Sequence, residues 1–439
     1  MQSKENLTSG GGWQDGLGFK ACLIGALLLI MLIPLMMIGS LVEERASRAT
    51  EVINAIGEVW GHEQEIVGPF LILPYDDVVS KTDEGEKLVR RTLVLLSKTL
   101  KVNGNFDVER RSLGLFDTNV YTAHLKINAL FDLSKEIAGL DPARLQLDAI
   151  VASLVLGDLR GLQGNISVTA NGQKLEVEPG SGTTQISPGV HVVLPNNLDK
   201  TDSLDIEISF SLRGSEAFNI WPSGGTTEIN LKSAWQSPSF LGRFSPSQRS
   251  VTADGFTAKW EILRMAQGIG PVLREGNSFS KFQNASVRFV EPVNSYSMSE
   301  RSIKYGSLFV LLTFAVLYLF EILAKKKVHP VQYMLMGLAL CLFFLALLAL
   351  SEHVPFGVAY GLASLIVVTL VSAYAKSVTR SSGWTIGIGV IQSTLFAFLY
   401  GVLMLEDMAL LAGATLLLAG LASAMYLTRN VDWYQAGKG

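Results

Sequence analysis

Residues 21–42 read ACLIGALLLIMLIPLMMIGSLV, a run of 22 residues without a charged side chain. About 20 apolar residues are needed for a helix to cross the hydrocarbon core of a bilayer. A cleaved signal peptide has a shorter apolar core with small residues at its cleavage site, whereas this run leads into Glu43-Glu44-Arg45. Residues 20–42 are therefore predicted to form an uncleaved transmembrane anchor, which Pro34 bends.

Five further apolar segments lie close together near the other end of the chain. They cover about 303–323, 331–350, 354–375, 384–404 and 408–427. Their connections are short, which predicts helical hairpins within a five-helix transmembrane bundle. Charged residues make up only 17% of the chain, against about 25% in soluble proteins. The sequence thus predicts a membrane protein with six transmembrane helices.

The distribution of Lys and Arg predicts how these helices are oriented. Basic residues follow the second, fourth and sixth segments, at Lys325–Lys327, at Lys376 and Arg380, and at Arg429 and Lys438. The alternate loops, Glu352-His353 and Glu406-Asp407, contain none. Under the positive-inside rule, both the tail 1–19 and the tail 428–439 are cytoplasmic. Residues 43–302 then form a periplasmic domain at the inner membrane of a Gram-negative bacterium.

A helical stalk is predicted at 43–60, directly after the anchor. Apolar residues recur at spacings of three and four, as in a coiled-coil seam, and comprise Val42, Ala46, Ala49, Ile53, Ile56 and Trp60. Gly61 is a suitable helix end. The seam either packs on the periplasmic domain or forms a dimer stalk, and the oligomeric state stays open.

The remainder of the periplasmic domain has the pattern of β-structure. Alternation of apolar and polar residues is clear at 123–127 and 205–210, and Asn103-Gly104 and Asn171-Gly172 are hairpin-type turns. We expect a mostly antiparallel, sandwich-like fold of about ten or more strands, with one helical stretch near 134–148. It forms one domain, or two with a boundary near 179–182.

Several short sequence strings follow one another in a characteristic order along the chain. They are VGP at 67–69 with Pro74, GDLRG at 157–161, SFLG at 239–242, HPVQY at 329–333, LSEH at 350–353 and LTRNVDWY at 427–434. In these strings and in its architecture the chain resembles the CreD family of inner-membrane proteins, from the anchor to about Tyr434. The resemblance implies a cell-envelope-integrity protein, expressed under a two-component regulatory system and tied to envelope stress and the β-lactam response. It implies no established activity and no known active site.

Composition excludes several other functions. The net charge of −3 provides no basic field for nucleic acid. Cys22 and Cys341 both lie in apolar runs, and the five histidines show no metal-ligand spacing. We therefore predict no metal and no cofactor.

Two short motifs are weak candidates for chemistry. Glu352 and His353, at the periplasmic mouth of a helical hairpin, could act as a proton-transfer pair, although a polar interfacial turn explains them as well. Ser278-Phe279-Ser280-Lys281 matches the SxxK pattern of serine–lysine enzymes, but no KTG or SDN partner motif is present. No GxSxG elbow and no P-loop occurs.

Polar residues in the predicted spans suggest helix packing more than transport. Glu321 precedes Lys325 by four residues, the spacing of an interfacial ion pair. Gln392, Ser393 and Thr394 suit hydrogen bonding between helices. Asp, Glu, Lys and Arg are missing from the middle of every span, which argues against an ion-coupled transporter.

Three hypotheses for function follow. The favoured one is non-enzymatic: the periplasmic domain binds an envelope protein or a cell-wall or lipid ligand, and the membrane bundle holds or signals that state. The second is a membrane enzyme acting on a lipid or cell-wall intermediate with Glu352 and His353 at its centre. The third is a translocator of a lipid-linked substrate. Trp221, Trp235 and Trp260 are expected to pack in the β-structure, or alternatively to form an aromatic surface for a glycan or peptide.

Overall fold

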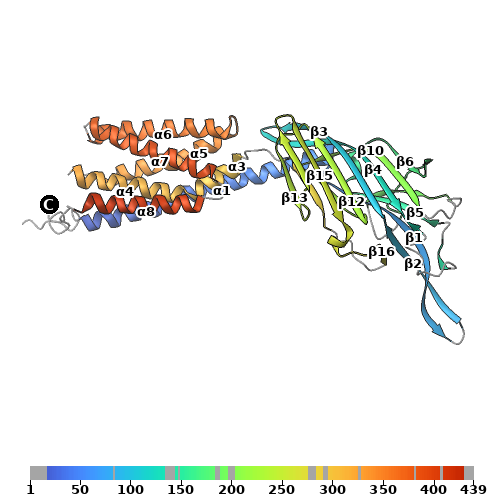
Figure 1. Ribbon diagram of the computed structural model, residues 1–439. Helices are drawn as coiled ribbons and strands as arrows, with labels where there is room; N and C mark the ends of the chain where they lie inside the picture. Colours follow the sequence, from blue (N-terminus) through green and yellow to red (C-terminus); the bar gives the residue numbers. More distant parts are fainter. Residues whose placement is uncertain are drawn as a thin grey trace, which may run out of the picture. The chain divides into compact units, whose positions relative to one another are not determined.

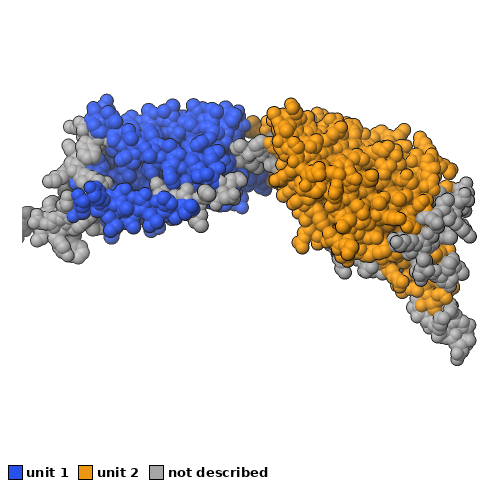
Figure 2. All heavy atoms as spheres, viewed as in Figure 1, with its two compact units in different colours: residues 1–48, 293–439 blue, residues 49–292 orange. Residues whose placement is uncertain are grey.

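The computed structural model of the protein describes residues 17–82, 85–133, 144–146, 149–182, 188–195, 203–274, 283–289, 295–324, 328–379, 382–405 and 409–429. The chain divides into two compact units, which we call the helical unit (residues 1–48 with 293–439) and the β unit (residues 49–292) (Figure 2). Helix α1, Leu17–Trp60, contributes residues to both.

The helical unit contains a helix at each of the six predicted apolar segments. Its helices after α1 are α3 (Ser295–Lys304), α4 (Gly306–Ala324), α5 (Pro330–Ser351), α6 (Phe356–Thr379), α7 (Ser382–Met404) and α8 (Ala409–Thr428). Among the described residues, α1, α5, α6 and α7 are long and apolar enough to cross a membrane. Helices α3 and α4 meet at a bend of 46° and provide a fifth span if they are counted as one. The apolar part of α8, Gly413–Ser423, is shorter than these spans.

Packing inside the helical unit is dominated by aromatic side chains. Phe343 of α5 and Phe396 of α7 have ring centroids 4.6 Å apart, and Tyr360 of α6 donates a hydrogen bond to the Phe396 carbonyl at 2.8 Å. The expected hydrogen bonding by Gln392 is present, because Thr313 of α4 donates to its Oε1 at 3.4 Å. These contacts join α4, α5, α6 and α7 into one core.

The β unit contains two sheets among its described residues (Figure 1). The nine-stranded sheet runs β13-β17-β11-β1-β5-β9-β8, with β2 paired to β1 and β16 paired to β2, and the eight-stranded sheet runs β14-β15-β12-β3-β4-β10-β6-β7. Pairing is antiparallel except for β1 with β11 and β12 with β3. The strands are β1 (Gln64–Thr82), β2 (Gly85–Leu96), β3 (Thr99–Leu113), β4 (Phe116–Phe131), β5 (Val151–Leu156), β6 (Leu162–Ala170), β7 (Gln173–Leu175), β8 (Glu178–Pro179), β9 (Gly189–Val193), β10 (Leu204–Ser215), β11 (Ala217–Trp221), β12 (Thr226–Ser233), β13 (Pro238–Gly242), β14 (Gln248–Thr252), β15 (Gly255–Leu263), β16 (Val272–Arg274) and β17 (Ala285–Phe289).

The two sheets share one hydrophobic core, as in a sandwich. Phe106 of β3 packs edge-on against Phe218 of β11 with ring centroids 4.9 Å apart, and both side chains are fully buried. Tyr121 of β4 also contacts Phe218 and donates a hydrogen bond to the Ala217 carbonyl at 2.7 Å. Burial removes the Tyr121 hydroxyl from water, and this loss of solvation raises the pKa of Tyr121. The β-structure is thus one compact unit, and β8 at the suggested boundary simply pairs with β9.

The alternation of apolar and polar residues in the sequence corresponds to the two faces of the eight-stranded sheet, one buried and one exposed. On β10 the buried residues Leu204, Ile206, Ile208 and Phe210 face the core, while the residues between them face outward. The expected helix near 134–148 lies mostly outside the described residues, since only Arg144–Gln146 are described there.

The stalk helix ends at Trp60, where the seam predicts its end. Seam residue Val42 is 1% exposed, and the other seam residues are partly shielded within the single chain. The Trp60 ring is flanked by two guanidinium groups, with Cζ of Arg213 at 4.1 Å and Cζ of Arg111 at 4.6 Å from its centroid. Such cation–π contacts hold the helix end against β3 and β10. A dimer stalk remains a prediction.

The GDLRG string at 157–161 forms the junction between this helix end and the β unit. Asp158 accepts a hydrogen bond from the His62 N–H at 3.2 Å and caps a short 3-10 helix, Leu159–Gly161. The buried Gln64 amide bridges the Asp158 carbonyl and the Arg213 carbonyl, at 3.1 and 2.8 Å. Burial acts to raise the pKa of Asp158, but hydrogen bonds from Arg160 and His62 outweigh it and lower that pKa.

Candidate functional site

Glu352 and His353, the two residues of the predicted site, have different contacts in the structure. Glu352 follows α5, and its carboxylate accepts a hydrogen bond from the Tyr296 hydroxyl at 3.4 Å and lies 3.9 Å from Nε of Arg45. His353 is exposed, and its backbone N–H donates to the Leu350 carbonyl at 3.0 Å. Among the described residues no hydrogen bond joins His353 to Glu352. Glu352 therefore links α1, α3 and α5, and the proton-transfer role remains a hypothesis.

Glu321 is part of a buried polar cluster that connects three helices. Its side chain is 8% exposed and forms an ion pair with Lys20 of α1. It also accepts hydrogen bonds from the Tyr333 hydroxyl of α5 at 3.0 Å and from the Val328 N–H at 3.1 Å. The expected partner Lys325 lies outside the described residues. The contacts indicate a structural tie between the anchor helix and the bundle.

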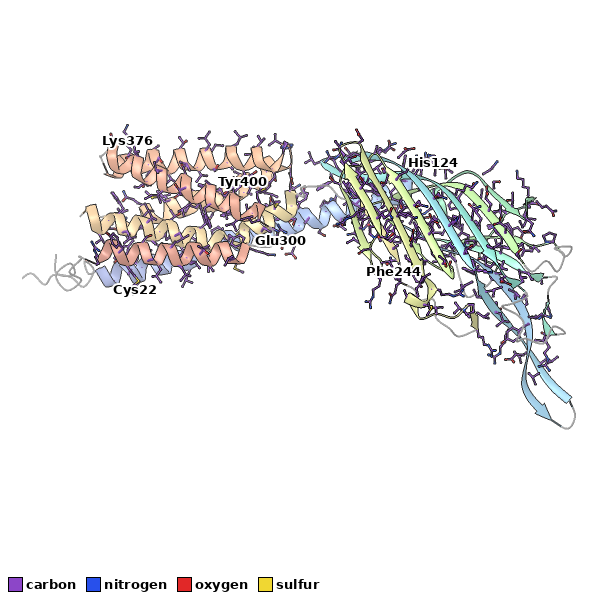
Figure 3. The ribbon with its side chains drawn as sticks, in the orientation of Figure 1. Cys22, His124, Phe244, Glu300, Lys376 and Tyr400 are labelled. Atoms are coloured by element: carbon purple, nitrogen blue, oxygen red, sulfur yellow. The ribbon has the colours of Figure 1, made fainter. Side chains whose placement is uncertain are left out.

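The tryptophans of the β unit do not form an aromatic surface. Trp260 is 1% exposed, and its indole N–H donates to the Phe244 carbonyl at 2.9 Å (Phe244 is labelled in Figure 3). Trp235 is partly buried and donates to the Ser237 carbonyl at 3.0 Å, while Trp221 donates to Glu65. Ser278–Lys281, the SxxK motif, lies outside the described residues.

A polar groove of about 1210 Å³ lies on the outer face of the eight-stranded sheet. Its lining comes from β3, β4, β6, β10, β12, β14 and β15, and His124 on β4 marks its position in Figure 3. Leu125, Phe210, Leu231 and Ala258 contribute only backbone to it, because their side chains are buried in the core. The groove is therefore lined by the outward-facing residues of the strands.

These outward-facing residues form two continuous rows across seven strands. Strand register aligns them in the order β14, β15, β12, β3, β4, β10, β6. Row 1 consists of Gln248, Lys259, Asn230, Asn103, Lys126, Ser209 and Ser167, and row 2 of Ser250, Thr257, Lys232, Asn105, His124, Ser211 and Gln163. All are amides, hydroxyls, lysines or histidine, and every one of them lines the groove.

The charges around the groove are arranged unevenly. No Asp or Glu lines it, whereas Lys126, Lys232, Arg249 and Lys259 do. Lys126 and Lys259 form ion pairs with Glu207 at 2.8 Å and Glu261 at 2.7 Å, acids in the next row beyond row 1. The hydrogen bond from Lys126 helps to hold the pKa of Glu207 below its usual value. Neither Lys232 nor Arg249 forms an ion pair with another described residue.

One cluster in the groove resembles a serine–histidine–aspartate arrangement. Nδ1 of His124 lies 2.9 Å from Oγ of Ser211, and Nε2 lies 3.2 Å from Oδ2 of Asp107. The side chain of Asp107 is 71% exposed and that of His124 50%. A catalytic triad depends on a buried, orienting acid and on oxyanion donors beside the nucleophile. We therefore interpret this cluster as polar cross-strand pairing.

No sequence motif could have revealed the groove. Its residues are common outward-facing polar side chains on strands up to 156 positions apart, from Asn103 to Lys259. Alternation predicts that each faces outward, but only the strand order aligns them. The signal that sequence does contain is the repeated Asn, Gln, Ser and Lys at alternate positions, such as Asn103 and Asn105.

Fold and site together define a membrane protein of several helices that carries a large β-sandwich unit with a polar groove. The profile of the CreD family, described as "Inner membrane protein CreD", matches residues 16–434. The protein "Inner membrane protein CreD" of Escherichia coli (strain K12) is 34% identical over 425 residues, covering 94% of this chain and 92% of that protein. The chain therefore belongs to the CreD family of inner membrane proteins, which confirms the resemblance seen in the short strings.

Comparison with solved structures adds no functional information. The M1 zinc metallopeptidase from Deinococcus radiodurans is 12% identical and covers 44% of this chain and 42% of that chain, with a TM-score of 0.23. A mutant of that metallopeptidase, bound to a peptide substrate, is 10% identical, covers 76% and 93% of the two chains, and also has a TM-score of 0.23. Scores this low establish no common fold. The described residues contain no group of three or more His, Cys, Asp or Glu side chains that could hold a metal ion.

Proposed function

We propose that the protein supports the integrity of the bacterial cell envelope by binding an envelope component in the groove of its β unit. The helical unit anchors this binding unit in the inner membrane. The observation that carries the proposal is the pair of polar rows, which present hydrogen-bonding groups across seven strands without competing acids in the lining. Membership of the CreD family supports a role in envelope stress, and the proposal extends this role to the β-lactam response under a two-component regulatory system.

The proposal places the β unit in the periplasm and both termini in the cytoplasm, with six spans in which α8 is the last. The positive-inside pattern of Lys and Arg supports this orientation. At the described chain positions, Lys376 near the end of α6 and Arg429 after α8 belong to that pattern. A periplasmic groove would face the cell wall and the lipids of the envelope.

Complementation of a deletion strain under β-lactam stress tests this function. Asn105→Trp places a large side chain in the middle of row 2, and we expect growth to fall to that of the strain without the gene. Lys174→Trp is the matched control, because Lys174 is exposed on β7 of the same sheet and does not line the groove. Membrane abundance of each variant must match that of the unaltered protein.

Two further variants separate this proposal from the enzyme and translocator alternatives. Glu352→Ala and His353→Ala should both complement, because neither residue lies in the β unit. Full growth with Asn105→Trp at normal abundance would reject the groove as the functional site. Loss of growth with His353→Ala at normal abundance would instead favour chemistry beside α5.

A further inference from the structure

We propose that the groove binds a glycan strand that carries carboxylates, the chemistry of peptidoglycan. This inference rests on the proposed function and names the ligand of the same site. It depends on three features of the groove: the hydrogen-bonding groups of its rows, its length, and the position of its lysines.

The rows match the hydrogen-bonding pattern of a sugar polymer. Side-chain amides both donate and accept hydrogen bonds, and so do hydroxyls. Sugar hydroxyl and acetamido groups have the same dual character, so Asn103, Asn105 and Asn230 can each bind a sugar in either sense. Asn230 already donates to Oδ1 of Asn103 at 3.2 Å, which fixes both amides on the groove floor.

The length of the rows suits a polymer better than a small molecule. Neighbouring strands are about 4.8 Å apart, so a row across seven strands extends about 29 Å. A ligand lying along a row would cross the strands and would meet a polar group on each of them. A single sugar would occupy only a small part of this surface.

Lys232 provides the specificity for a carboxylate. It lies in row 2 between Thr257 and Asn105, and it forms no ion pair with another described residue. Lys126 and Lys259, in contrast, are already paired with acids outside the groove. An ammonium group that lacks an acidic partner favours an anionic group on the ligand, and such charge-assisted hydrogen bonds are stronger than neutral ones.

Other macromolecules fit the groove less well. Protein interfaces have a centre of aromatic and apolar side chains, and acyl chains also require apolar contact, yet neither row contains such a residue. Nucleic acid binding depends on many cations along the phosphate backbone, whereas three lysines occur in the rows and two of them are paired. A carboxylated glycan satisfies both the amide content and the modest positive charge.

The test is co-sedimentation of the full-length protein, in detergent micelles, with purified peptidoglycan sacculi. We expect the unaltered protein to sediment with sacculi and to bind them about tenfold more weakly when their carboxylates are converted to amides. Lys232→Gln should weaken binding about tenfold, the usual effect of losing one charge-assisted hydrogen bond. Arg274→Gln, on the other sheet, should leave binding unchanged.

Asn103→Leu with Asn105→Leu should weaken binding to both native and amidated sacculi, because it removes contacts to the sugars themselves. The inference is overturned if the protein fails to sediment, if Lys232→Gln binds as well as the unaltered protein, or if lipopolysaccharide binds and sacculi do not. Failure to sediment while Asn105→Trp still abolishes complementation would reject the glycan and leave the proposed function standing. Failure of both experiments would reject the groove altogether.

Discussion

Gly161→Ala should destabilise the β unit by about 3 kcal/mol or more, the upper range for overpacking a buried site. A Cβ atom on Gly161 would overlap the Arg213 carbonyl oxygen and lie 2.7 Å from Nε2 of Gln64. Neither group can move easily, because Arg213 is paired with Thr122 in the centre of the sheet and Gln64 is fully buried. Thermal unfolding of the purified protein measures the effect.

Gly270→Ala is the matched control for this substitution. The nearest atom to a Cβ atom on Gly270 is the Val272 carbonyl oxygen at 3.9 Å, an ordinary contact. We expect its midpoint of thermal unfolding to match that of the unaltered protein. Equal stability of Gly161→Ala and Gly270→Ala would show that the junction tolerates expansion and would contradict its role in fixing the stalk helix to the β unit.

Glu321→Leu should cost about 3 kcal/mol in the stability of the helical unit, because it leaves the partly buried Lys20 charge uncompensated and two hydrogen-bond donors without their acceptor. The substitution removes the acceptor of the Tyr333 hydroxyl and the Val328 N–H, and it leaves the Lys20 ammonium without its ion pair. The change is measured by thermal unfolding in detergent, with the loss of soluble protein as the readout.

A second substitution distinguishes an electrostatic cause from simple misfolding. Lys20→Met combined with Glu321→Leu should recover much of the lost stability, since replacing both partners of a buried pair by apolar residues is often nearly neutral. If the double variant is no more stable than Glu321→Leu alone, the Lys20–Glu321 pair does not tie α1 to the bundle. If Glu321→Leu alone is as stable as the unaltered protein, the cluster has no structural role.

Local sequence patterns predict the elements of this protein well. The uncharged run at 21–42, the seam that ends at Trp60, and the alternation at 205–210 each depend on residues close together in the chain. The structure has helices or strands at all three places. The second apolar segment, predicted at 303–323, corresponds to α4, and the bend between α3 and α4 lies near the start of that segment.

The functional surface could not be predicted in this way, because it depends on strand order and register. Lys232 and Asn105 are neighbours only because β12 pairs in parallel with β3, and parallel pairing of distant strands has no local signature. For the same reason the pairing of Glu321 with Lys20, 301 residues away, has no local signature, while the predicted partner Lys325 lies outside the described residues. Short-range spacing indicates partners on the same helix, whereas a partner on a distant helix depends on tertiary packing.

The most direct test of the central claim is photocrosslinking in growing cells from a probe amino acid at position 257. Thr257 is exposed in row 2 beside Lys232, and a probe at Lys174 on β7 serves as the control. We predict that position 257 crosslinks to an envelope component during β-lactam treatment, and that position 174 does so far less. Equal and weak crosslinking at both positions would contradict the conclusion that the groove is where this protein meets the envelope.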